Sequence, residues 1–118
     1  LTGVRDASFV MLTDEYEKYG KVHITTEDGS VGEKGFVVHH SVFNRLTDYS
    51  MIYTCGPEVM MKAVAKRAQE VGVECEVSLE NLMACGVGAC LCCVTDTPKG
   101  RKCVCTEGPV FNSKDLLW

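Results

Sequence analysis

Residues 51–79, MIYTCGPEVMMKAVAKRAQEVGVECEVSL, carry the clearest structural pattern in the chain. Met51 to Thr54 predict a short buried strand, and Cys55-Gly56 predict a tight turn. Pro57 suits the first position of a helix, and Gly72 is typical of the residue that follows one. Val73 to Leu79 predict a second strand. This β-α-β order predicts a parallel, doubly wound sheet and therefore the α/β fold class.

The helix of this unit is expected to bury one apolar face. Its apolar residues recur at helical spacing, and the face that we expect to be buried consists of Val59, Met60, Ala63, Val64, Ala68 and Val71. In the second strand, alternation places Val73, Cys75 and Val77 on one side.

The flanking sequence suggests a division into two domains. We expect strands at 1–5 and 22–26, a helix from Asp6 to Lys18, and a short helix from Phe36 to Leu46. Residues 1–79 are interpreted as a partial nucleotide-binding domain. Residues 80–118 are interpreted as a small cysteine-rich domain with a C-terminal tail, because Gly and Cys replace the periodic apolar pattern there.

Six of the eight cysteines fall between residues 85 and 105. Cys85, Cys90 and Cys93 have the C-x4-C-x2-C spacing of plant-type [2Fe–2S] proteins, which need a fourth cysteine further along the chain. Spacing alone leaves Cys103 and Cys105 as alternatives for that ligand. The pattern predicts a [2Fe–2S] cluster and electron transfer.

The residues between these cysteines agree with that interpretation. Gly86, Gly88 and Ala89 are small, so the backbone can approach an anionic cluster and turn its N–H groups towards it. Cys92 adjoins a proposed ligand and is expected to be a packed thiol that points elsewhere.

Other uses of the cysteines fit less well. Zinc on four cysteines more often uses two separated CxxC pairs, whereas Cys90 and Cys93 form the single such pair here. A disulfide framework would spread cysteines through a small secreted chain. The first residues lack the features of a signal peptide, so we expect a reducing compartment, the cytoplasm. A zinc-bound interaction module remains the alternative from another class.

The composition argues against two further classes of partner. The formal net charge is −4 and the 12 Lys and Arg residues are scattered, so no nucleic-acid partner is expected. No window of about 18 continuous apolar residues exists, so no membrane span is expected.

Four segments carry a resemblance to a known family. ENLMACGVGAC at 80–90 and VCTEGPVF at 104–111 closely resemble the electron-transfer subunit of two-subunit, NAD-linked (class 1B) bacterial dihydroorotate dehydrogenase. YTCGPEVM at 53–60 looks like the C-G-P motif of the wider ferredoxin-reductase superfamily, and DGSVGEKGF at 28–36 is similar to the loop that precedes it. The resemblance selects Cys105 as the fourth ligand.

The resemblance implies a route for electrons in pyrimidine synthesis. They would pass from dihydroorotate to FMN in a catalytic partner subunit, then through the [2Fe–2S] cluster to FAD and NAD. Cys55 and Gly56 would border the nicotinamide and diphosphate, with a buried thiol in a tight turn as the alternative for Cys55. Asp28 and Gly29 would touch the dinucleotide or simply form a common turn. A related NAD(P)H-linked ferredoxin reductase or sulfhydrogenase subunit is the closest rival.

The chain also departs from the family pattern. It contains neither the β-barrel that binds FAD nor the Gly-rich first β-α turn of the nicotinamide domain. We therefore expect either a C-terminal fragment or a subunit completed by another chain, with no dehydrogenase activity alone. The apolar tail is expected to pack onto a domain or to form a subunit interface, such as that of a homodimer; it comprises Phe111, Leu116, Leu117 and Trp118.

Overall fold

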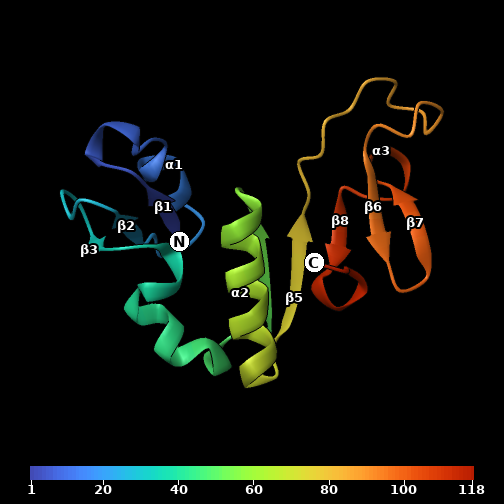
Figure 1. Cartoon of the computed structure of the whole chain (residues 1–118). Coiled ribbons are helices and arrows are strands. Elements are labelled where there is room, and N and C mark those ends of the chain that lie inside the picture. The colour runs from blue at the N-terminus through green and yellow to red at the C-terminus, as the bar shows by residue number, and fades with distance from the viewer. The chain divides into compact units, whose positions relative to one another are not determined.

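The computed structural model describes all 118 residues and shows a mixed α/β protein (Figure 1). The chain divides into two compact units, residues 1–45 and 46–118, which are described separately. Three small sheets are present, two of three strands and one of two. None of the helices is both long enough and apolar enough to cross a membrane.

The first unit contains a parallel three-stranded sheet. Its strands lie in the order β1, β2, β3, with Gly3 opposite Thr25 and Thr26 opposite Lys34. The bounds are Thr2–Val4 for β1, Ile24–Thr26 for β2 and Glu33–Lys34 for β3. The predicted strands at 1–5 and 22–26 are therefore confirmed, although both are shorter than expected.

The predicted helix from Asp6 to Lys18 is wrong. The structure has a 3₁₀ turn, η1 (Ala7–Phe9), and a short helix, α1 (Thr13–Glu17). The Asp6 carboxylate accepts a hydrogen bond from the Ser8 N–H at 2.8 Å, which satisfies the backbone locally. Leu12 has a φ of 59°, in the left-handed region, and this conformation separates the two pieces.

Residues 37–48 form 3₁₀ turns rather than the expected short helix at 36–46. These are η2 (Val37–His39) and η3 (Ser41–Asp48), and Arg45 has non-helical dihedral angles within η3. Glu33 organises this region, because its carboxylate accepts from the Ser41 N–H at 2.8 Å and lies 3.4 Å from Nε2 of the buried His40.

The second unit is built on the predicted β-α-β motif. Strands β4 (Met51–Cys55) and β5 (Glu74–Ser78) are parallel, with Tyr53 opposite Glu76. Helix α2 (Glu58–Val71) connects them. Gly72 ends the helix with a φ of 75°, as its position after the last apolar residue predicts.

The buried face of α2 differs from the expected one. Val64 and Ala68 are buried as predicted, but Val59 is 80% exposed. The other buried positions are Met61 and Ala65. This face packs on β5, whose buried residues are Cys75 and Val77. The core of the unit thus lies between α2 and the sheet.

The cysteine-rich segment leaves this sheet and returns to it. Strand β8 (Val110–Asn112) pairs antiparallel with β5, with Ser78 opposite Val110, and the Leu79 N–H donates to the Pro109 carbonyl at 3.0 Å. Between these points lie the hairpin strands β6 (Val94–Thr97) and β7 (Gly100–Cys103) and the one-turn helix α3 (Val104–Glu107).

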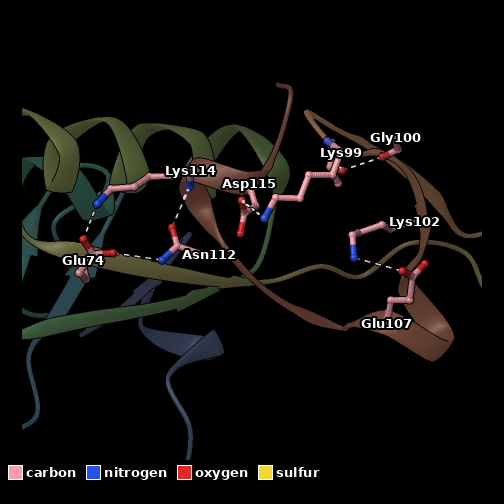
Figure 2. Close-up of polar contacts among 9 residues, drawn as sticks. Glu74, Lys99, Gly100, Lys102, Glu107, Asn112, Lys114 and Asp115 are labelled. Atoms are coloured by element: carbon pink, nitrogen blue, oxygen red, sulfur yellow. Dashed lines mark hydrogen bonds and ion pairs between the residues drawn. The ribbon is translucent and has the colours of Figure 1, made fainter.

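The C-terminal tail contacts both the sheet and the hairpin. Figure 2 shows Lys114 and Asn112 beside Glu74 of β5, with Asn112 Nδ2 3.0 Å from the carboxylate. Asp115, the last residue of the 3₁₀ turn η4 (Ser113–Asp115), lies 3.9 Å from Lys99 at the hairpin turn. The expectation that the tail packs onto a domain is confirmed for Phe111 and Leu116, which are buried, whereas Leu117 and Trp118 are exposed.

Candidate metal centre

The hairpin brings the last two proposed ligands together. Val94 of β6 is opposite Cys103 of β7, and the Val104 N–H donates to the Cys93 carbonyl at 3.1 Å. Val104 is fully buried, which fixes the start of α3. Cys105 in α3 is thereby held beside Cys93, although the two are far apart in the sequence.

Backbone N–H groups point at the cysteine sulfurs. The Cys85 sulfur accepts from the N–H groups of Val87 at 3.5 Å and Cys90 at 3.4 Å. The Cys90 sulfur accepts from the Cys92 N–H at 3.5 Å, and the Cys93 sulfur from the Cys105 N–H at 3.4 Å. Donors in these positions stabilise negative charge on sulfur, as a metal–thiolate site requires.

The four sulfurs form two pairs. The Cys90 N–H donates to the Cys85 sulfur and the Cys105 N–H to the Cys93 sulfur, so Cys85 neighbours Cys90 and Cys93 neighbours Cys105. No group of three or more Cys, His, Asp or Glu side chains is arranged to hold a single metal ion. Four thiolates in two pairs match the donor set of a two-iron cluster better than that of one tetrahedral zinc ion.

The pKa values of the paired thiols follow from these contacts. The N–H groups of Cys90 and Val87 lower the pKa of Cys85 to about 6 from an ordinary 9.0. The Cys105 N–H, followed by the Cys105 side chain, lowers the pKa of Cys93. The same side-chain contact raises the pKa of Cys105, with burial as the next cause. Contact between the two thiols thus moves their pKa values apart, down for Cys93 and up for Cys105.

The loop between Cys85 and Cys93 depends on left-handed backbone conformations. Gly86 and Gly88 have φ values of 70° and 76°, and Leu91 has a φ of 57°. A side chain at either glycine position would be strained, so the small residues noted in the sequence serve the backbone path. The loop is largely exposed, and its apolar side chains Val87 and Leu91 face solvent.

Two further cysteines adjoin the paired ones. Cys103 is half-buried, and burial raises the pKa of its thiol. Its sulfur lies 3.9 Å from the Gly88 carbonyl oxygen, on the other side of the loop. Cys92 is exposed, so the expectation that it is a packed thiol is wrong.

Two polar residues support the site and were given no role from the sequence. Asn81 Nδ2 lies 3.4 Å from the carbonyl oxygens of both Cys93 and Val94. Glu107 accepts from the Cys103 N–H at 2.8 Å and from Lys102 Nζ at 3.1 Å, and Figure 2 shows the contact with Lys102. Both lie within segments quoted above, but no local pattern identifies them, because their contacts depend on the hairpin.

The predicted nucleotide residues lie in different units. Cys55 and Gly56 are in the second unit, at the end of β4, where parallel strands present ligand sites. The Cys55 sulfur lies 3.4 Å from Glu80 Oε1, and the pKa of Cys55 is raised by burial and then by Glu80. A pocket of roughly 580 Å³ adjoins this turn, with Gly56 in its lining. A nucleotide role for these residues stays a prediction.

Asp28 and Gly29 are in the first unit, in the turn after β2. The Asp28 carboxylate accepts from the N–H of Ser30 at 2.9 Å and from its hydroxyl at 2.7 Å. These bonds lower the pKa of Asp28. They are those of a common turn, and contact with a dinucleotide stays a prediction for both residues.

Comparisons with known proteins agree with this geometry. Residues 80–117 match the model of the iron–sulfur cluster binding domain of dihydroorotate dehydrogenase B. The chain is 43% identical over 105 residues to the dihydroorotate dehydrogenase B (NAD(+)) electron transfer subunit of Clostridium acetobutylicum, covering 88% of this chain and 42% of the relative. For the Clostridium perfringens subunit the identity is 43% over 115 residues, with coverage of 97% and 45%.

A solved structure shows the same fold. It is the NADH-dependent reduced ferredoxin–NADP oxidoreductase, studied for flavin-based electron bifurcation, and one chain of it is 31% identical to this protein with a TM-score of 0.81. The match covers 98% of this chain and 42% of the solved one. The chain thus spans less than half the length of these relatives.

The fold and the cysteine site define an α/β protein of the ferredoxin-reductase kind that carries an iron–sulfur cluster binding domain. More specifically, residues 80–117 match the iron–sulfur cluster binding domain of dihydroorotate dehydrogenase B, and most of the chain is similar to part of the electron transfer subunits of that enzyme.

Proposed function

We propose that the chain transfers electrons through a [2Fe–2S] cluster held by Cys85, Cys90, Cys93 and Cys105. The pairing of the four cysteines carries this proposal, because each pair can serve one iron. The N–H groups on three of the sulfurs supply the stabilisation that an anionic cluster needs. When bound, such a cluster accepts and donates single electrons, so it can connect two flavins.

The route and the partners extend this proposal. By analogy with relatives named as electron transfer subunits, electrons come from FMN in a dihydroorotate-oxidising catalytic subunit, within pyrimidine synthesis. They leave towards FAD and NAD in the complete protein. Cys55 and Gly56 would meet the nicotinamide there, and Asp28 and Gly29 the dinucleotide. The exposed Leu117 and Trp118 suit a subunit contact, including that of a homodimer.

The architecture of the complete protein is also part of the proposal. Residues 1–79 would contribute to one doubly wound nucleotide-binding sheet, and residues 80–118 would form the cluster domain and tail. The parallel pairing found within each unit, β1–β2–β3 in the first and β4–β5 in the second, supports this proposal. All eight cysteines are free, which fits a reducing cytoplasm.

Metal analysis of the anaerobically purified chain tests the cluster. We expect about two irons and two sulfides per chain, with visible absorption that bleaches on addition of dithionite. Cys85→Ala and Cys105→Ala should lose this absorption, whereas Cys92→Ala, which removes an exposed neighbouring thiol, should keep it. A colourless wild-type protein that contains zinc would contradict the proposal.

Rapid mixing tests the route. Dihydroorotate should reduce the cluster only when an FMN-containing catalytic subunit is also present, and NADH should not be turned over by the 118-residue chain alone. Reduction by NADPH and a ferredoxin, without any effect of dihydroorotate, would instead support the related reductase function.

A further inference from the structure

Two histidines and one glutamate form a cluster of titratable side chains in the first unit, whereas all proposed metal ligands belong to the second. His40 is 5% exposed, and its ring meets the His23 ring edge to face, with 4.9 Å between the ring centroids. Its Nε2 lies 3.4 Å from Oε1 of Glu33. The three side chains come from different segments, since His23 precedes β2, Glu33 begins β3 and His40 lies between η2 and η3.

Hydrogen bonds determine which nitrogen of His40 carries the proton. Nδ1 accepts from the Val42 N–H at 3.0 Å, so in the neutral ring the proton is on Nε2, which faces Glu33. A second proton, on Nδ1, would set two N–H groups against each other and deprive Val42 of this acceptor. The next turn starts here as well, because the His40 carbonyl accepts from the N–H of the buried Phe43 at 2.9 Å. Charging His40 therefore disturbs the start of η3.

The Glu33 carboxylate can offset one positive charge on the two rings but not two. Ser41 holds it in place, because the Ser41 hydroxyl donates to it and the Ser41 N–H donates at 2.8 Å. These bonds lower the pKa of Glu33, so the carboxylate stays ionised where histidine titrates. The other charged groups that act on His23 are Lys21 and the amino group of Leu1, and both are positive. A second imidazolium therefore has no partner.

We propose that His23, His40 and Glu33 form a pH-sensitive latch, which holds residues 37–43 to strands β2 and β3 until acid charges both rings. Burial, followed by the neighbouring His40, lowers the pKa of His23 below its ordinary 6.5. The folded unit thus binds this proton less tightly than an opened one, so the latch stabilises the unit above pH 6.5 and weakens as the pH falls towards the lowered value. The latch needs neither cluster nor nucleotide and stands apart from the proposed electron transfer.

Local amide exchange of the 118-residue chain between about pH 7 and about pH 5 tests the latch. Protection of residues 37–43, corrected for the intrinsic pH dependence of exchange, should fall by about tenfold per pH unit wherever the opened form binds one proton more. Glu33 stays ionised in this range, because its pKa is lowered from 4.5. The readout is local because Cys85, in the second unit, titrates near pH 6.

Three variants separate the members of the latch. His23→Phe keeps a ring beside His40 but cannot be charged, so it should remove the pH dependence. Glu33→Gln keeps an oxygen for Ser41 but loses the negative charge, so it should move the loss of protection to higher pH. His39→Gln is the matched control, because His39 adjoins His40 in sequence but is exposed, and it should behave like the wild type.

Constant protection of the wild type across this range overturns the latch, and so does an unchanged pH dependence in His23→Phe. A loss of protection that His39→Gln abolishes would assign the effect to the exposed histidine and would also overturn it. If His23→Phe does not fold, proton NMR of the ring Cε1–H groups of the wild type decides. The His23 and His40 signals should each shift in two steps, because each ring senses the charge of the other. Two independent single-step titrations would contradict the latch.

Discussion

At the scale of single residues, backbone hydrogen bonds lower the pKa of Cys85 below that of an ordinary cysteine. Two backbone N–H groups reach its sulfur and lower its pKa to about 6, whereas burial raises the pKa of Cys55. A cysteine with a pKa of 9.0 is only about 1% thiolate at pH 7. Cys85 is thus largely a thiolate at pH 7 in the metal-free chain, and the thiolate is the form that binds metal.

This predicts a difference in alkylation of the cluster-free protein. Below pH 6 the Cys85 thiol carries its proton and reacts slowly; above pH 6 it is a thiolate and reacts fast. The rate of iodoacetamide addition, followed by peptide mass spectrometry, should therefore rise with a midpoint near pH 6 at Cys85. Cys55, in the same samples, should react appreciably only at much higher pH. A Cys85 midpoint near 9 would contradict the contacts described for the loop.

At the scale of elements, α2 holds the second unit together through a face centred on Met61 and Val64. Met61→Ala removes a side chain that is 3% exposed, so we expect the free energy of unfolding to fall by about 3 kcal/mol. Val59→Ala is the matched control, because Val59 lies in the same helix but is 80% exposed, and its effect should stay within about 0.5 kcal/mol. Denaturant unfolding measures both, and equal effects would show that the buried face is assigned wrongly.

The same helix shows how far local sequence signals extend. The two ends of α2 were predictable because Pro57 favours the start of a helix and Gly72 favours its end. The strands on both sides of the helix are rich in apolar residues. The buried face was only partly predictable, because the sequence assigned Val59 to it, whereas the structure buries Met61 and Ala65. Between Asp6 and Lys18 the prediction failed, since a side-chain bond to Ser8 competes with helix formation.

The candidate site was likewise only partly predictable from the sequence. The spacing of Cys85, Cys90 and Cys93 predicted a metal site from sequence alone. The choice between Cys103 and Cys105 depends on the register of the β6–β7 hairpin, which sets which of the two meets Cys93. The roles of Asn81 and Glu107 depend on the same register, so periodicity could not reveal them.

At the scale of the whole molecule, a bound cluster should stabilise the two units unequally. All four proposed ligands lie in residues 46–118, and binding stabilises the part of the structure that forms the site. Hydrogen exchange measured with and without cluster should therefore show protection gained mainly at residues 80–109 and little change at 1–45. Cys105→Ala, which cannot complete the ligand set, should exchange like the cluster-free wild type. Equal protection of both units would contradict this division.

The pairing of β5 with β8 has a consequence for how such proteins can be built. Ser78 is opposite Val110, so the chain leaves and re-enters the sheet at neighbouring positions, and the ends of 80–109 meet. A segment closed in this way is a cassette. Because its ends meet, we expect that a tight turn can replace it and leave β5 and β8 as a simple hairpin. Redox capacity can thus be gained, lost or exchanged at one sheet edge without rebuilding the sheet.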